Sequence, residues 1–226
     1  MQFSLLDLYP IQYCDGYKGL PGSAVCESYV TIESSVEHLI RRISMGSCNA
    51  SKWALEEKFE QLISPISNQN IDMKNKGSVF YDYRFRHPVY NPWALTREIE
   101  KIGSKLAQGQ LLFHGGDFKG ISHNHNGCFV TELPLSTTLS PDIAVYFSER
   151  HSRNHGLESY KIQVLKVATT CQLKAVLFTQ KPPNGLGMAN EMELLLSAGA
   201  KIEINDERVH KDLLNRTFTI TYCTLL

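Results

Sequence analysis

Asn190-Glu191-Met192-Glu193-Leu194-Leu195-Leu196 is the stretch on which the predicted fold depends. It follows a loop rich in Gly and Asn, residues 184–190, and leads on to a second apolar run at residues 201–204. The pattern predicts a loop that delivers two acidic residues to the start of an apolar strand. Because side chains alternate along a strand, Glu191 and Glu193 are expected on the same face. Two like charges beside an apolar wall raise a carboxylate pKa, which favours a functional site, although a solvated strand end is the alternative interpretation.

The composition is that of an ordinary globular protein. The 226 residues can bury a core as one domain or as two small lobes. Lys+Arg and Asp+Glu both number 23, so the formal net charge is zero. Nucleic-acid or membrane binding through a broad basic surface is therefore not expected. No apolar run has the length of a transmembrane helix, and residues 1–7 lack the basic region of a conventional secretory signal.

Six cysteines are spread along the chain without a Cys-x-x-Cys pair. Wide, irregular spacing in a chain of this size predicts free thiols and a reducing cytoplasmic environment. The run His123-Asn-His125-Asn-Gly-Cys128 contains zinc-ligand types, but its spacing matches no tetrahedral set, so we expect a polar loop and no metal site. The cysteines stand at positions 14, 26, 48, 128, 171 and 223.

The first half of the chain has helical periodicity. Apolar spacing predicts helices from Ser35 to Gly46, from an Asn49 or Ser51 cap to before Pro65, and from Pro92 to Gly109. Between the last two, residues 80–88 are rich in aromatic side chains. We interpret them as a connecting segment whose rings pack on the core, in preference to a recognition surface.

The second half has the character of strands. Short apolar runs occur at residues 111–114, 128–133, 160–167, 173–178, 193–196, 201–204 and 216–225, with one helix between them from Pro141 to about Ser148. Helices followed by strands predict an α+β fold, with no wound βαβ unit. We divide the chain into a mainly helical lobe, residues 1–90, and a core, residues 91–226, which together form one compact unit.

Three motifs then follow in order: Leu112-Phe113-His114-Gly115-Gly116, Ser136-Thr137-Thr138 with Ala144 and Phe147 downstream, and Glu191-Met192-Glu193. This series resembles the mono-ADP-ribosyltransferase superfamily over residues 92–226, in particular the Arg-Ser-Glu (Glu-x-Glu) branch of bacterial toxins and effectors. The resemblance implies an ADP-ribosyltransferase-like fold, in which a helical N-terminal lobe packs on two facing, mainly antiparallel β-sheets. NAD, the co-substrate, would lie in the cleft between them.

The resemblance also implies catalytic roles for three residues. Glu193 matches the glutamate that holds the nicotinamide-ribose 2′-hydroxyl and stabilises the oxocarbenium-like ribose. Glu191 matches the glutamate that positions or deprotonates an acceptor arginine; a solvated acid at a loop end is the alternative. Ser136 matches the serine that supports the catalytic glutamate by hydrogen bonds.

Five further residues match positions that bind the cofactor. Phe147 stands where a ring lies against nicotinamide, with a core Phe as the alternative, and Arg150 where an arginine meets the diphosphate, with a surface Arg as the alternative. Thr137 and Gly115 belong to the same motifs; Thr137 also has the character of a strand residue that packs the sheets together. His114 replaces the Arg of this branch and resembles the ribose-binding histidine of the diphtheria-toxin branch.

The histidine leaves several hypotheses open. Either His114 binds ribose while Arg150 contacts phosphate, or NAD binding is impaired and the domain is a catalytically inactive binding module; a buried histidine satisfied by backbone is the third possibility. We expect a monomeric enzyme that transfers ADP-ribose to a protein side chain, with arginine favoured over Ser or Thr. By the resemblance it would be a secreted bacterial effector acting on a host protein in the host cytosol.

Overall fold

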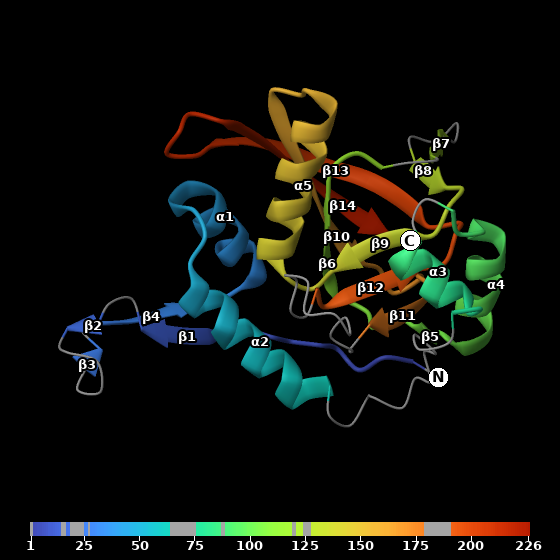
Figure 1. The fold of residues 1–226 in the computed structure, drawn as a ribbon, viewed down its shortest axis with the longest axis horizontal. Coiled ribbons are helices and arrows are strands. Elements are labelled where there is room, and N and C mark those ends of the chain that lie inside the picture. Colours follow the sequence, from blue (N-terminus) through green and yellow to red (C-terminus); the bar gives the residue numbers. More distant parts are fainter. Residues whose placement is uncertain are drawn as a thin grey trace.

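The computed structural model describes residues 2–14, 17–18, 25–26, 28–63, 76–86, 89–118, 121–123, 128–178 and 191–226, and every structural statement below concerns these residues. They form an α+β fold around a ten-stranded sheet (Figure 1). The helices are α1 (Ser35–Met45), α2 (Asn49–Ile63), α3 (Val79–Phe85), α4 (Pro92–Ile102) and α5 (Pro141–His155). The strands of the large sheet are β5 (Ser104–Lys105), β6 (Leu111–Gly115), β7 (Ile121–His123), β8 (Cys128–Thr131), β9 (Leu135–Thr138), β10 (Ser159–Val167), β11 (Lys174–Phe178), β12 (Glu193–Leu196), β13 (Lys201–Lys211) and β14 (Thr217–Leu225).

The sheet is mainly antiparallel and consists of two parts. Its strand order is β5-β11-β12-β9-β6-β10-β14-β13-β8-β7, and among these described neighbours only β10 and β14 run parallel. The part β5-β11-β12-β9 meets the part that begins at β6 through one residue pair, Phe113 with Thr138. The two sheets predicted from the sequence are therefore two parts of one hydrogen-bonded series, and the junction lies between the first two motifs.

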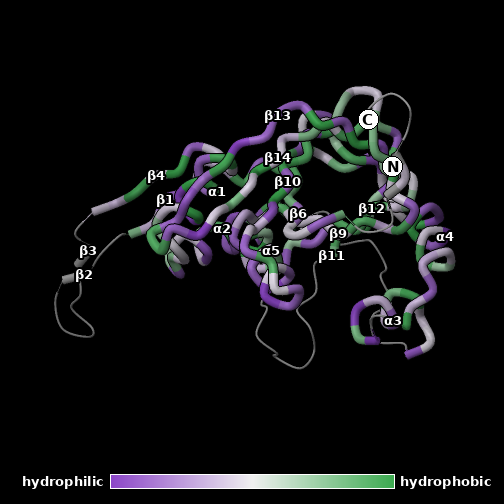
Figure 2. Tube along the Cα trace, turned by 90° about the horizontal axis from the view of Figure 1, so that it is seen from above, coloured by the Kyte–Doolittle hydropathy of each residue, from purple (hydrophilic) through white to green (hydrophobic). Residues whose placement is uncertain are grey.

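Two groups of helices cover different parts of the sheet, while α2 packs on a core that both parts share. Leu39 of α1 and Val145 of α5 pack with Phe113 and Ile162 in one apolar cluster, while Leu95 of α4 joins β11 and β12 in another. Figure 1 shows α1 and α2 on one side of the molecule and α3 and α4 on the other, with α5 between them. In Figure 2 the helices alternate between hydrophilic and hydrophobic colours, as expected for helices with one buried side.

The described residues before α1 include short strands, which the sequence did not predict. They contain β1 (Ile11–Cys14), β2 (Tyr17–Lys18), β3 (Val25–Cys26) and β4 (Tyr29–Ile32); β1 pairs with β4 and β2 with β3, both antiparallel. Ahead of β1, the Phe3 amide donates to the Lys105 carbonyl at 2.8 Å, and Leu6 is buried with Leu194 in the core. The described part of residues 1–90 is thus helical only from Ser35 onward.

Three helix predictions need correction. The helix from Pro92 ends at Ile102, because Gly103 takes an extended conformation and β5 follows; it does not continue to Gly109. The helix from Pro141 continues past Ser148 to His155, where Gly156 caps it with a left-handed φ of 64°. The aromatic segment contains α3, whose N-cap Ser78 accepts a hydrogen bond from the Tyr81 amide.

The prediction of free thiols is wrong at one position. Cys14, at the end of β1, is disulfide-bonded, whereas Cys48, Cys128, Cys171 and Cys223 are free. Because disulfides persist in oxidising environments, Cys14 does not fit the reducing environment predicted for the chain. In the described part of the chain, no helix is both long and apolar enough to span a membrane.

Candidate active site

Glu193 is the buried centre of the candidate site. It begins β12, pairs with Thr138 of β9, and is only 4% exposed. Ser136 lies two residues before Thr138 and so projects from the same face of the sheet. Its hydroxyl donates to Glu193 Oε1 at 2.6 Å. The strand register therefore brings together the serine and glutamate that the sequence placed 57 residues apart.

A second hydroxyl reaches the same oxygen from α3. Tyr83 donates to Glu193 Oε1 at 2.6 Å. Its ring stacks on Phe178 of β11 with centroids 6.1 Å apart, and Phe80, 3% exposed, anchors the helix on the same ring. Burial, together with the negative charge of Glu193, raises the pKa of Tyr83 well above its usual value, so the phenol remains a donor.

Arg84 joins the two acidic residues. Its Nη1 donates to Glu193 Oε2 at 2.6 Å and also to Glu191 Oε2. The side chains of Arg84, Glu191 and Glu193 are 12%, 15% and 5% exposed. Burial disfavours the charged guanidinium, but the carboxylates of Glu193 and Glu191 outweigh this and raise the Arg84 pKa. The site is therefore a largely desolvated cluster of two acids and one base, which short helix α3 completes.

The two acids have different environments. Burial raises the pKa of Glu191, and the Glu193 charge raises it further, against the lowering effects of Arg84 and Arg150. A raised carboxyl pKa suits a group that accepts a proton near neutral pH. Glu193, in contrast, accepts three hydrogen bonds from Ser136, Tyr83 and Arg84, which hold its carboxylate in one orientation.

The backbone between the acids departs from the strand that the sequence predicted. β12 begins only at Glu193, and Met192 has a φ of 47°, in the left-handed region that a side chain other than glycine rarely adopts. Thr138 Oγ1 donates to the Glu191 carbonyl at 2.6 Å and holds this turn. Such strain costs about 1–3 kcal/mol and is found at functional sites. Glu191 thus reaches Arg84 from a turn. The two acids meet there because of this turn, and not because side chains alternate along a strand as the sequence predicted.

His114 lies on the other part of the sheet, at the junction. Its Nδ1 is 2.8 Å from the Ser136 carbonyl oxygen, which can only accept, so Nδ1 carries a proton. Burial lowers the His114 pKa, partly offset by the carbonyls of Ser136 and Asp117, so the ring is neutral and Nε2 is an acceptor. Nε2 is buried without a hydrogen-bond partner among the described residues. Nδ1 therefore has the structural role of a backbone-bound histidine, and Nε2 is a buried acceptor whose hydrogen bond is not made by any described residue.

Two glycines bring the end of β6 against α5. A Cβ on Gly115 would lie 2.0 Å from the Ala144 carbonyl oxygen and 2.8 Å from the Ser148 amide nitrogen. Gly116, with a φ of 108°, would place a Cβ 3.1 Å from the His151 ring. Gly115 therefore permits close packing of helix on strand, which adds a structural reason for a residue predicted to bind the cofactor.

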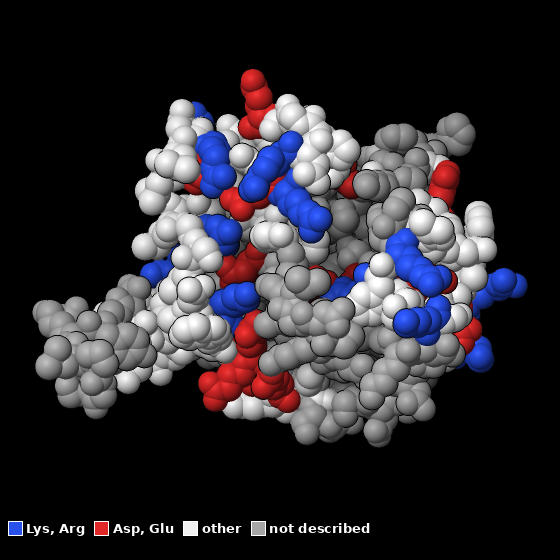
Figure 3. Space-filling model, in the orientation of Figure 1, with Lys and Arg blue, Asp and Glu red and all other residues white. Residues whose placement is uncertain are grey.

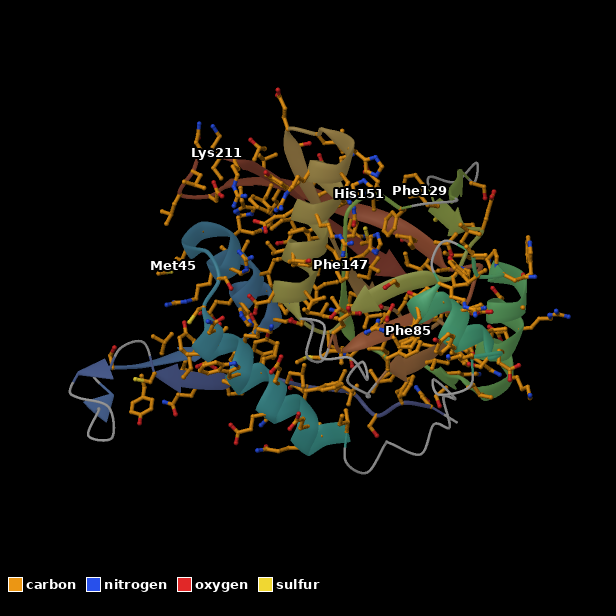
Figure 4. The ribbon with its side chains drawn as sticks, in the orientation of Figure 1. Met45, Phe85, Phe129, Phe147, His151 and Lys211 are labelled. Atoms are coloured by element: carbon orange, nitrogen blue, oxygen red, sulfur yellow. The ribbon has the colours of Figure 1, made fainter. Side chains whose placement is uncertain are left out.

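The close packing sets the positions of two predicted cofactor residues on α5. Phe147 is partly exposed, and Figure 4 shows it with His151 on the side of α5 that faces β6 and β9. Arg150 is exposed, and its positive charge is one of the causes that lower the Glu191 pKa. Figure 3 shows further basic side chains gathered over α5 and α1.

Thr137 has a different position from the one expected of a cofactor ligand. It is 2% exposed, and its hydroxyl donates to the Leu194 carbonyl at 2.7 Å. The side chain ties β9 to β12 within the sheet. Its role is therefore to hold together the strands that carry Ser136 and Glu193.

A second polar cluster lies away from the acids. Tyr9 Oη is 2.8 Å from His38 Nδ1, His38 Nε2 is 3.0 Å from Asp142 Oδ2, and Arg42 also contacts Asp142 at 3.2 Å. His38 is 2% exposed, and the cluster joins the N-terminal segment, α1 and α5. Its burial and its position between elements indicate a structural tie.

The described residues contain no group of three or more His, Cys, Asp or Glu side chains placed to hold a metal ion. His125 and the loop at residues 184–190 lie outside the described residues, and the loops predicted there stay predictions.

Sequence reasoning missed Tyr83 and Arg84. The available signals were the Ser78 cap and the need of two buried like charges for a cation. The aromatic run hid both, because it has the composition of a connecting segment or a strand. Phe80 and Tyr83 do pack on the core, as predicted, whereas Phe85 is exposed.

Comparison with known proteins gives similarity only at the level of solved structures. No protein-family model and no curated protein matches the chain. Among solved structures it is similar to the ADP-ribosyltransferase toxin Plx2a from Paenibacillus larvae, with 14% identity, a TM-score of 0.38, and coverage of 79% of this chain and 95% of Plx2a.

Two further solved structures are similar. The binary enterotoxin component BECa of C. perfringens, solved with NADH, gives 14% identity and a TM-score of 0.43 over 95% of this chain and 56% of BECa. The Vis toxin of Vibrio splendidus, an ADP-ribosyltransferase, gives 16% identity and a TM-score of 0.36 over 69% of this chain and 62% of Vis. Because identities and TM-scores are this low, we derive function from the geometry of the site.

Proposed function

We propose that this protein is a mono-ADP-ribosyltransferase that transfers ADP-ribose from NAD to a protein side chain and releases nicotinamide. The observation that supports this most is the buried Glu193, which three donors orient beside a second carboxylate of raised pKa. Cleavage of the nicotinamide–ribose bond develops positive charge on the ribose, and a fixed carboxylate stabilises that charge. The pair thus supplies the two groups that the reaction needs.

Each residue would have a separate task. Glu193 would accept a hydrogen bond from the ribose 2′-hydroxyl and stabilise the cationic sugar as the C1′–N bond to nicotinamide breaks. Ser136 and Tyr83 would hold its carboxylate in place. Glu191 would accept a proton from the acceptor nitrogen as that nitrogen bonds to C1′. Nicotinamide leaves with the electron pair of the broken bond, so the charges balance.

NAD would be held from the other part of the sheet and from α5. The unpartnered His114 Nε2 accepts, so it suits a ribose hydroxyl. The Arg150 guanidinium suits phosphate oxygens, and the partly exposed Phe147 ring suits nicotinamide. These contacts fit the group, and they are the basis for assigning NAD as the co-substrate.

The acceptor proposed is arginine. Glu191 accepts a hydrogen bond from a guanidinium, that of Arg84, which supports a guanidinium as the acceptor group. A Ser or Thr hydroxyl is the competing acceptor. On the resemblance of its motifs, we further propose a monomeric, secreted bacterial effector that acts on a host protein, and the disulfide at Cys14 fits a secreted protein.

The test is nicotinamide release from labelled NAD with a cell lysate as acceptor source. Glu193→Gln should lower release by about 10²–10³-fold, the usual effect of removing one preorganised electrostatic group. Glu203→Gln is the matched control, because Glu203 is an exposed acid on β13. Equal release by wild type and Glu193→Gln would contradict the proposal.

The runner-up is a binding module without catalysis. It is favoured by the three hydrogen bonds that Glu193 accepts from Tyr83, Arg84 and Ser136, which use most of its acceptor positions. Calorimetry with NAD separates the two functions: binding with no nicotinamide release from the wild type would support the module.

A further inference from the structure

We propose that Arg84 is itself an acceptor, so that the protein ADP-ribosylates its own helix α3. This inference rests on the proposed function and extends it to a modification site within the chain. The chemical class of the modification is an N-glycosidic bond between a guanidinium nitrogen and C1′ of ADP-ribose.

The position of Arg84 carries the proposal. Its Nη1 donates to Glu193 Oε2 at 2.6 Å and to Glu191 Oε2. In the proposed reaction Glu193 binds the 2′-hydroxyl, and the carbon bearing that hydroxyl is bonded directly to C1′. Two groups bound to one carboxylate are neighbours, so Arg84 lies beside the site of C1′. Reacting atoms need to approach to about 3–3.5 Å.

Glu193 can bind the substrate while Arg84 stays in place. A carboxylate has about four acceptor positions, two on each oxygen. Tyr83 and Ser136 use those of Oε1, and Arg84 uses one of Oε2. One position on Oε2 remains for the ribose hydroxyl, so the hydrogen-bonding capacity of Glu193 allows it to bind the substrate and Arg84 at once.

Glu191 supplies the base that a guanidinium requires. A guanidinium is charged and becomes a nucleophile only as it loses a proton. Arg84 donates directly to Glu191, and burial raises the pKa of that carboxyl, which makes it a better proton acceptor. The Arg84 nitrogen bonds to C1′, the C1′–nicotinamide bond breaks, nicotinamide leaves with the electron pair, and the proton passes to Glu191.

The fold presents Arg84 in cis. Phe80 and Tyr83 pack against Phe178 and fix α3 beside β12. Arg86, which caps the same helix, instead contacts Asp82 at 3.4 Å, and its side chain is 57% exposed. Of these two arginines, Arg84 alone is paired with the acids.

The experiment is mass spectrometry of the purified protein after incubation with NAD, with nicotinamide measured in parallel. We expect one ADP-ribose on the peptide that contains Arg84, formed at a rate independent of protein concentration. Tagged Glu193→Gln mixed with the wild type should remain unlabelled, because the reaction is intramolecular. Arg84→Lys should lose this label, while Arg86→Lys, the matched control, should keep it.

The outcomes separate the two proposals. Nicotinamide release with an unmodified Arg84 would overturn this inference and leave the proposed function standing. Label on Arg84 whose rate rises with protein concentration would overturn the assignment in cis. No label on the wild type here, together with no nicotinamide release when the lysate is added, would overturn both.

Discussion

Tyr83→Phe removes one hydroxyl from the candidate site and leaves its ring in place. The lost bond, 2.6 Å from Oη to Glu193 Oε1, has the length of a charge-assisted hydrogen bond. Such bonds contribute about 1.5–3 kcal/mol. Because Ser136 still donates to the same oxygen and Arg84 to the other, Glu193 keeps two partners. We therefore expect the lower end, a loss of about 1.5 kcal/mol in the free energy of unfolding.

Loss of the Tyr83 hydroxyl should also lower the rate of nicotinamide release. A carboxylate held by two donors in place of three is less well oriented in the transition state, and about 1.4 kcal/mol corresponds to a tenfold change. We expect nicotinamide release to fall about tenfold in kcat, with little change in KM for NAD. Urea unfolding and steady-state kinetics measure the two effects.

Tyr81→Phe is the matched control for this prediction. Tyr81 lies on the same helix and contacts Phe85, with centroids 4.9 Å apart, so its change tests general effects on α3. Ser136→Ala combined with Tyr83→Phe should cost more than the two single changes together, because Glu193 Oε1 then loses both donors. If Tyr83→Phe kept the stability and the nicotinamide-release rate of the wild type, the role assigned to the Tyr83 hydroxyl would be refuted.

Three further predictions concern other parts of the site. His114→Asn and His114→Ala should both raise KM for NAD about tenfold, which corresponds to the free energy of roughly one hydrogen bond. Only the Ala variant should unfold at a lower urea concentration, because the Asn amide can still donate to the Ser136 carbonyl. An unchanged KM would exclude a ligand contact at Nε2. Glu191 has a raised pKa in the folded state, so its stabilising effect is present below its ordinary pKa of 4.5 and is lost as pH rises through the folded pKa. The unfolding free energy of the wild type should therefore fall with rising pH relative to that of Glu191→Gln. Parallel pH profiles of the two proteins would contradict this. Gly115→Ala should cost at least about 3 kcal/mol or prevent folding, because its Cβ would meet the Ala144 carbonyl at 2.0 Å; normal thermal unfolding would show that β6 and α5 can separate.

Much of the second half could be predicted from the sequence because its strands have strong local patterns. The alternation in residues 216–225 corresponds to β14, and the apolar run after Glu193 corresponds to β12. Helix starts were also predictable where a cap and a proline coincide, as at Asn91-Pro92. In these cases local chemistry and tertiary packing favour the same conformation.

The remainder depends on contacts between distant residues. Tyr83 and Glu193 are 110 positions apart, and α3 has only seven residues, too few for helical periodicity to emerge. Its position depends on Phe80 packing against Phe178, which no local pattern reveals. The turn at Met192 was hidden for a related reason, since its positive φ is held by Thr138 from a neighbouring strand.

The junction between β6 and β9 has a mechanical consequence. One backbone pair, Phe113 with Thr138, joins the two parts of the sheet there, and the His114 side chain adds a second link to the Ser136 carbonyl. The proposed ligand contacts divide across this line, with His114 on one side and Glu193 on the other. A dinucleotide bound to both would connect the two parts of the sheet across this junction. Binding energy could then be converted directly into alignment of the reacting groups.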